Sequence, residues 1–165
     1  MKVECDVNLT EKEVYNYVMY HTYSSFSGYI GLLLSVCALF GMVYAWNGMP
    51  WLHRGLLLLT GLLFTVIQPA VLYLKSKQQV KRNQAINKPL HYCFDEDGIH
   101  ISQGEQSART GWEEVTKVTN TKLNVIIYVT KIRAFVIPKS SLEGKYEDLK
   151  SIIKNNAKAF YIKLR

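Results

Sequence analysis

Two long uncharged apolar runs constrain this chain more than any other feature of its sequence. The first extends from Tyr29 to Trp46 and the second from Leu56 to Leu74, with a break at Asn47-Gly48-Met49-Pro50. A helix of about 18 residues is roughly 27 Å long, close to the roughly 30 Å hydrocarbon core of a bilayer. The sequence therefore predicts two membrane-spanning helices, at residues 29–46 and 55–74, joined by a short outer turn.

The residues around these runs predict an orientation. Aromatic rings, which settle at headgroup depth, bracket the runs at Tyr20, Tyr23, Phe26, Tyr29, Tyr44, Trp46 and Trp51. Basic residues cluster directly after the second run, whereas the turn offers only His53 and Arg54. By the positive-inside rule we expect a two-span protein of the cell membrane with both termini in the cytoplasm.

The second run carries one conspicuous polar pair, Gln68-Pro69. Proline removes a backbone donor, so a kink is expected there, and the Gln68 amide would seek an interhelical hydrogen bond. The pair is interpreted either as a hinge or polar transport site, or as packing between the two helices. Because neither run contains an ionisable residue, a small transporter is the weaker reading.

The flanking segments suggest a domain organisation. Residues 1–28 begin with strand-like alternation from Val3 to Leu9, followed by a helix that starts at Glu11 behind the capping pair Thr10 and Glu13. A lone strand is unstable, so this segment is expected to dock on the C-terminal half. Residues 75–89 form a basic juxtamembrane linker that ends at Pro89, and residues 90–165 form a soluble domain.

The soluble domain is predicted to be a sheet followed by a helix. Strands are expected at residues 90–94 and 99–102, around a turn in which Gly98 takes a positive φ, and then at 110–119, 124–129 and 133–137. Apolar residues at helical spacing from Leu142 to Ile153 predict a closing helix. The fold class is thus a two-helix membrane hairpin plus a cytoplasmic α+β domain, with an antiparallel, pleckstrin-homology-like sheet closed by the C-terminal helix.

Three short motifs stand out in this domain. They are Phe94-Asp95-Glu96-Asp97-Gly98-Ile99, Gly111-Trp112-Glu113-Glu114-Val115 and Phe135-Val136-Ile137-Pro138-Lys139. In order and spacing they resemble motifs of the YcxB-like membrane proteins, and the overall layout, a short N-terminal segment, two spans and a C-terminal domain, is also similar to that family. The resemblance implies no activity and no functional residues, and each motif is explained by a turn, a core tryptophan or the end of a strand.

Motifs for chemistry are missing from the sequence. It contains no nucleophile elbow, phosphate-binding glycine loop or recognisable carboxylate pair, so we predict that the protein is not an enzyme and uses no cofactor. If Phe94 pairs with Ile99, then His91, Cys93 and His100 share one face of the hairpin, but a fourth zinc ligand is not evident. No metal site is predicted; the alternative is a polar outer face.

Two functions of different kinds remain for a chain with a net charge of +7 and 48% hydrophobic residues. The domain is either an interaction module that binds a protein partner or a second copy, or a module that reads anionic lipid; no nucleic-acid-binding module is visible. The interaction module is preferred. The lipid reading would use the following basic residues: Lys75, Lys77, Lys81, Arg82, Lys158, Lys163 and Arg165.

Overall fold

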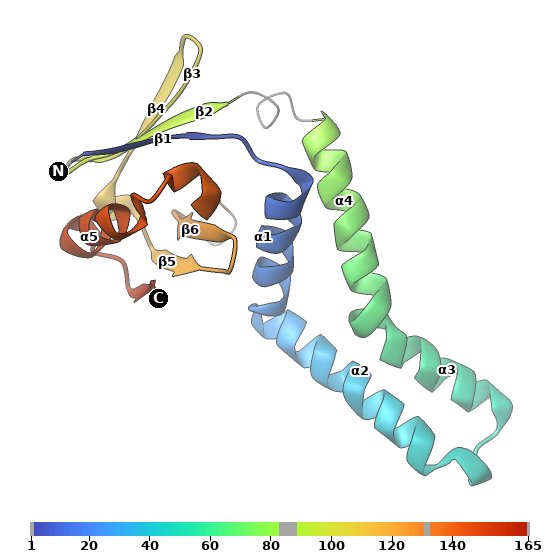
Figure 1. Ribbon diagram of the computed structural model, residues 1–165. Coiled ribbons are helices and arrows are strands. Elements are labelled where there is room, and N and C mark those ends of the chain that lie inside the picture. The colour runs from blue at the N-terminus through green and yellow to red at the C-terminus, as the bar shows by residue number, and fades with distance from the viewer. Residues whose placement is uncertain (1, 83–88, 131–132, 165) are drawn as a thin grey trace. The chain divides into compact units, whose positions relative to one another are not determined.

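The computed structural model describes residues 2–82, 89–130 and 133–164, and the chain divides into two compact units. The helical unit consists of residues 18–78. The sheet unit combines residues 1–17 with residues 79–165. Figure 1 follows the chain through both units by colour.

The helical unit contains the two apolar runs. Helix α2 (Phe26–Tyr44) begins behind Ser25, whose hydroxyl accepts a hydrogen bond from the backbone N–H of Gly28 at 3.1 Å. A short 3-10 turn, η1 (Trp46–Gly48), leads to α3 (Trp51–Leu62). The π-helical segment η2 (Leu63–Ile67) and α4 (Gln68–Arg82) continue α3, and the path bends between α3 and α4 in Figure 1.

Both helical stretches could cross a membrane by their length and composition. They are Phe26–Tyr44 and Trp51–Arg82, and they include most of the spans expected at 29–46 and 55–74. Only 17% and 11% of their apolar windows are buried. Most of the apolar surface of both windows is therefore left uncovered by the rest of this chain.

Small residues bring α2 close to the second helical stretch. A Cβ on Gly31 would lie 2.3 Å from the Phe64 ring, and a Cβ on Gly61 would lie 2.4 Å from the Leu39 side chain. Ser35 lies between these contacts and is 1% exposed. Close backbone approach through glycine and serine is typical of helix pairs in membranes.

The π-helical segment explains the irregularity expected at Gln68-Pro69. The backbone N–H of Gln68 bonds to the carbonyl of Leu63, five residues earlier, and Pro69 has no N–H to offer. Other side chains compensate: the Tyr23 hydroxyl donates to the carbonyl of Phe64, and Ser35 Oγ accepts from the N–H of Phe64 at 3.4 Å and donates to the carbonyl of Thr60 at 2.9 Å. The interhelical hydrogen bonds thus come from Ser35 and Tyr23.

Two four-stranded sheets form the sheet unit. Sheet A has the order β1-β2-β3-β4, with β1 (Val3–Val7), β2 (Leu90–Phe94), β3 (Gly98–Gln103) and β4 (Gln106–Gly111), all antiparallel. Sheet B has the order β7-β6-β5-β8, with β7 (Ala134–Pro138), β6 (Asn124–Tyr128), β5 (Lys117–Asn120) and β8 (Tyr161–Lys163). The β5–β8 pair is parallel, whereas the other pairs of sheet B are antiparallel.

One hydrophobic core joins these elements. The alternation in β1 places Val3, Cys5 and Val7 on the core side, where β1 pairs with β2. Helix α5 (Tyr146–Asn156) contributes Leu149 and Ile153, both 0% exposed. The N-terminal strand therefore completes the core of a sheet whose other strands lie about 85 or more residues later in the chain.

Helix α1 (Glu11–Tyr23) follows β1 and begins in the sheet unit. The Glu13 carboxylate accepts a hydrogen bond from the backbone N–H of Thr10 at 3.0 Å, which is half of the expected capping pair. Asn124 Nδ2 donates to the carbonyl of Glu13 at 2.9 Å, and Thr121 Oγ1 donates to Asn16 Oδ1 at 2.5 Å. The first turns of α1 are thereby fixed to the start of β6.

The α+β class is confirmed, but the sheet differs from the expected single curved one. The strand expected at 110–119 is the end of β4, a 3-10 turn η3 (Trp112–Glu114) and β5. Strand β4 was not foreseen as a separate strand, and Leu142 lies in a 3-10 turn, η4 (Lys139–Leu142), ahead of α5. In the expected linker 75–89, α4 continues to Arg82, and residues 83–88 lie outside the described residues.

Candidate functional site

The three motif segments of the sequence converge in the core of the sheet unit. Phe94 and Ile99 are 0% exposed, Trp112 is 3% exposed, and Ile137 is 0% exposed. Trp112 also donates a hydrogen bond from Nε1 to the carbonyl of Asp95 at 2.8 Å. These side chains build the fold, and what remains available for function is the surface around them.

The turn between β2 and β3 is held by Asp95. Its carboxylate accepts from the backbone N–H of Asp97 at 2.9 Å and of Gly98 at 3.0 Å, and Gly98 has the expected positive φ, 154°. Desolvation opposes ionisation of this carboxyl, but the two N–H donors and His100 together lower the pKa of Asp95 below its usual range. Asp95 therefore acts as a turn-forming carboxylate.

The outer face of sheet A carries the His and Cys side chains that the hairpin register predicted together. Phe94 pairs with Ile99 and Cys93 with His100, as expected. Each imidazole faces a carboxylate: His91 Nδ1 lies 2.7 Å from Asp6 Oδ1, and His100 Nε2 lies 3.1 Å from Asp95 Oδ2. Within residues 2–82, 89–130 and 133–164, no three His, Cys, Asp or Glu side chains are grouped to hold a metal ion.

The thiols of sheet A differ in their surroundings. Burial, with the nearby Asp6 charge, raises the pKa of Cys5 to about 11. Desolvation also raises the pKa of Cys93. A raised pKa keeps a thiol protonated and weakly nucleophilic near neutral pH, so neither residue has the character of a catalytic cysteine.

Strand β4 forms an open edge of sheet A. From Gln106 to Arg109 every residue is exposed, and in the described part of the chain β4 pairs with β3 alone. At the opposite edge, β1 lies against η4, and Lys145 Nζ donates to the carbonyl of Glu4 at 3.1 Å. Figure 1 shows the β3–β4 hairpin extending beyond β1 and β2 of the same sheet.

Protection of the β4 edge is slight. Natural sheets guard their edges with charged residues, proline or bulges. The strand contains no proline, and its one charged side chain, Arg109, has Nη2 3.7 Å from Asp97 Oδ2. The backbone groups along Gln106, Ser107 and Ala108 are therefore accessible to another strand.

The C-terminal tail presents a different surface. Phe160 is fully exposed and Tyr161 is 43% exposed, and the lysines on either side, Lys158 and Lys163, are exposed as well. Lys117 Nζ lies over the Tyr161 ring at 5.7 Å from its centroid. Residues 161–163 form the last strand, β8, which pairs with β5.

The other predicted lipid-facing residues lie on one helix. Lys75, Lys81 and Arg82 are exposed on α4, and Lys77 is half-buried there. Arg165, the last residue of the predicted set, lies outside the described residues. The helix therefore presents a basic segment directly after the apolar run.

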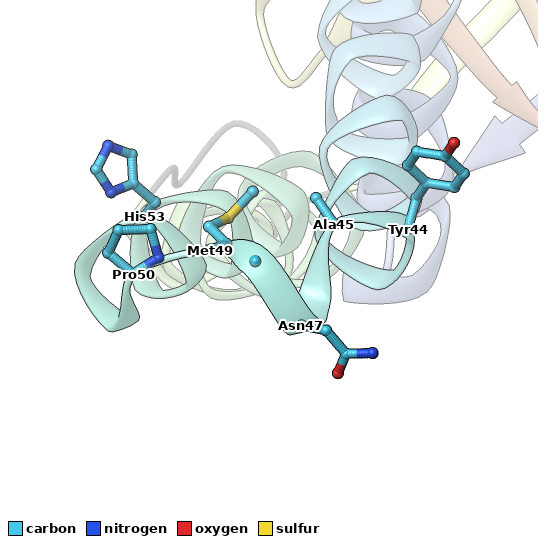
Figure 2. Close-up of a pocket in the computed structure, with 7 residues that line it drawn as sticks. Tyr44, Ala45, Asn47, Met49, Pro50 and His53 are labelled. Carbon is cyan, nitrogen blue, oxygen red and sulfur yellow. The ribbon is translucent and has the colours of Figure 1, made fainter.

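Two hollows escaped the sequence analysis. One, of about 370 Å³, lies at the turn between α2 and α3; Figure 2 shows its lining, with Tyr44 and His53 on opposite sides of the turn. Arg54 fixes this turn, because its guanidinium lies 4.7 Å from the Trp46 ring centroid and its Nε donates to the carbonyl of Met49 at 3.0 Å. No spacing signal marked the hollow.

The second hollow, of about 260 Å³, lies in the sheet unit beside β1. It is lined by Glu4, Cys5, Asp6, His91, Ser141, Glu143 and Lys145. These residues come from segments that are widely separated in the sequence, and they meet through the β1–β2 pairing and the contacts of β1 with η4 and Lys145. No local pattern could have identified them.

Comparison with known proteins finds similarity to one family in the sheet unit. Residues 94–153 match the family described as YcxB-like protein. The chain is 25% identical to the uncharacterized protein YcxB of Bacillus subtilis (strain 168) over 145 residues, which cover 80% of this chain and 78% of that protein. No solved structure matches. All three motif segments lie within residues 94–153, and the resemblance inferred from them is confirmed.

Proposed function

Taking the YcxB-like region at residues 94–153 as its soluble part, we propose that this chain is a membrane-tethered interaction module. The helices α2 and α3–α4 cross the cell membrane with both termini in the cytoplasm, and the sheet unit binds a protein partner. The domain has a pleckstrin-homology-like architecture, supported by its two four-stranded sheets and by the buried apolar face of α5. It acts by binding and not as an enzyme.

The open edge at β4 is the observation that carries this proposal. An exposed edge strand offers unpaired N–H and C=O groups in a row, and an extended peptide can add to it as a further strand. Such addition derives its affinity from main-chain hydrogen bonds, so a site of this kind needs no catalytic or metal-binding side chains. The sparse charge along Gln106–Gly111 leaves this edge accessible.

Site-specific photo-crosslinking in native membranes tests the proposal. A photoreactive residue at Gln106, on the edge, should capture one protein in near-equal amount, and the same residue at Ser151, exposed on α5, should not. The full chain must be used, because a fragment that starts at residue 89 would lack β1 and its three core side chains.

A charge variant on β4 tests whether the crosslinked protein binds at the β4 edge. Lysine on an edge strand opposes further pairing, so Ser107→Lys should abolish the crosslink at Gln106. Ser151→Lys adds the same charge on the exposed side of α5 and should leave the crosslink unchanged. Equal capture by the wild type and Ser107→Lys would contradict the proposal.

The exposed aromatic tail supports a second candidate, a surface that reads anionic lipid. Phe160 has no cover, and Lys158 and Lys163 flank it. An apolar ring can insert at headgroup depth, and each nearby lysine contributes about 1 kcal/mol of attraction to an anionic surface. The lysines and Arg82 at the end of α4 would add to this attraction.

Lipid adducts distinguish the second candidate from the first. With the full chain in bilayer nanodiscs, a photoreactive residue at position 160 should label lipid when anionic lipid is present. The Lys158→Glu/Lys163→Glu/Arg165→Glu variant should reduce this labelling. Labelling that is absent, or equal in neutral and anionic bilayers, would remove the lipid reading.

A further inference from the structure

Gln68 differs from the other polar side chains of the second apolar run. Thr60 Oγ1 donates to the carbonyl of Leu56 at 2.9 Å, and Thr65 Oγ1 donates to the carbonyl of Gly61 at 2.7 Å, so both hydroxyls are satisfied by their own helix. For the amide of Gln68, no hydrogen bond occurs within the described residues. The amide is polar on both its oxygen and its nitrogen and has no local partner.

The environment of Gln68 limits which groups could form hydrogen bonds with its amide. The carbonyl of Phe64, one turn earlier, already accepts from the Tyr23 hydroxyl. Gln68 lies six residues before Leu74, the end of the apolar run, which places it roughly 9 Å inside the hydrocarbon boundary. A glutamine side chain is too short to reach lipid headgroups from that depth, and lipid tails offer neither donor nor acceptor.

Gln68 also has access to the surface of the helix. Leu72 and Ser76, one and two turns later, are buried, whereas Val71 and Lys75 on the adjoining side are exposed. Gln68 itself is half-buried, at the margin between these two faces. A second helix that lies against Val71 would therefore meet the Gln68 amide.

We propose that two copies of this chain associate within the membrane through Gln68, whose amides exchange hydrogen bonds across the interface. A primary amide both donates and accepts, so an identical amide is complementary to it. A twofold axis along the membrane normal places the same residue of both copies at the same depth. This inference rests on the membrane placement proposed above, and it concerns a site separate from β4.

The association of purified full-length chain in liposomes tests the inference. Single-molecule photobleaching over a range of protein-to-lipid ratios gives the dimer fraction and thus the dimerisation constant. Wild-type chain should dimerise, and Gln68→Leu should weaken dimerisation about eight-fold if two hydrogen bonds are lost, or about three-fold if one is lost. Gln68→Asn, which keeps a shorter amide, should fall between the two.

Thr60→Val is the matched control. It removes a hydroxyl from the same apolar run, but one that bonds within its own helix, and it should leave the dimerisation constant unchanged. Wild-type chain that is monomeric at every ratio, or that dimerises as strongly with Gln68→Leu as without it, would overturn the inference.

Extraction by alkaline carbonate separates this outcome from failure of the proposed function. A chain that carbonate releases from native membranes would overturn the membrane placement and the inference together. A chain that stays in the membrane but is monomeric would overturn the Gln68 interface alone and leave the β4 proposal standing.

Discussion

Replacement of Gly98 by alanine tests how the β2–β3 turn supports the sheet unit. Gly98 has φ 154°, which side-chain-bearing residues rarely adopt, and a Cβ there would lie 2.4 Å from the backbone carbonyl oxygen of Thr110. The strained backbone costs about 1–3 kcal/mol. The clash adds a similar amount, about 1–3 kcal/mol, because Thr110 belongs to the paired strand β4 and cannot move freely.

The sum of the two costs, about 2–6 kcal/mol, predicts a large local effect. It is a considerable part of the roughly 5–15 kcal/mol that stabilises a typical domain. Amides of sheet A whose exchange requires opening of the sheet should exchange about 100-fold faster in Gly98→Ala. Hydrogen exchange of the full chain in nanodiscs, read by mass spectrometry on peptides from β2 and β3, measures this directly.

Gly104→Ala is the matched control for the steric part. Gly104 also has a positive φ, 60°, but nothing lies within 4 Å of the position that a Cβ would take. It should cost only about 1 kcal/mol, a roughly five-fold change in exchange. If Gly98→Ala speeds exchange by less than about ten-fold, or no more than Gly104→Ala does, the contact with Thr110 does not constrain the turn as argued.

Three further perturbations have defined outcomes. Ser35→Ala removes both interhelical hydrogen bonds of that hydroxyl and should destabilise the helical unit by about 1 kcal/mol, seen as faster exchange at η2; exposed Ser27→Ala is the control. Burial raises the pKa of Cys5 to about 11, above its ordinary value of about 9. The contribution of the Cys5 thiol to the free energy of unfolding should therefore be intact below pH 9 and lost as the pH rises to 11. In a series of denaturant unfolding measurements over this pH range, Cys5→Ala should lack this loss. The pKa of Asp95 is lowered in the folded chain, so the contribution of this carboxylate to the free energy of unfolding is present above the unfolded-state pKa and is lost as the pH falls through the folded-state pKa. Asp95→Asn keeps an acceptor for the turn, and its free energy of unfolding should fall less steeply at acid pH. An unchanged acid dependence of unfolding would contradict this role.

Much of the fold could be predicted because its signals are local. The helix start at Glu11, the helices in the two apolar runs, the pairing of Phe94 with Ile99 and the positive φ of Gly98 each depend on a few neighbouring residues. The strand expected at 110–119 failed for the same reason. Thr110 and Val118 are both buried and strand-like, but the 3-10 turn at Trp112 divides them between two sheets.

The candidate surfaces were only partly predictable. The basic residues from Lys75 to Arg82 and in the C-terminal tail were identified from the sequence, because residues of like charge that are clustered along the chain can be recognised without a structure. The open edge at β4 depends on which strand stands last in sheet A, and that order is not written in the sequence of Gln106–Gly111 itself. The hydrogen-bond partners of the second apolar run likewise depend on the tertiary structure, in which Ser35 and Tyr23, and not Gln68, make the interhelical hydrogen bonds.

The sequence by itself determined that this chain carries two helices able to cross a membrane and an α+β region similar to YcxB-like proteins, since hydrophobic length, periodicity and short motifs are properties of contiguous residues. Only the tertiary structure decided that β1 completes the core of sheet A, that the strands divide into two sheets, and that β4 is left at an open edge. The physical reason is that strand order and register are set by contacts between residues far apart in the chain, whose backbone hydrogen bonds have no local signature.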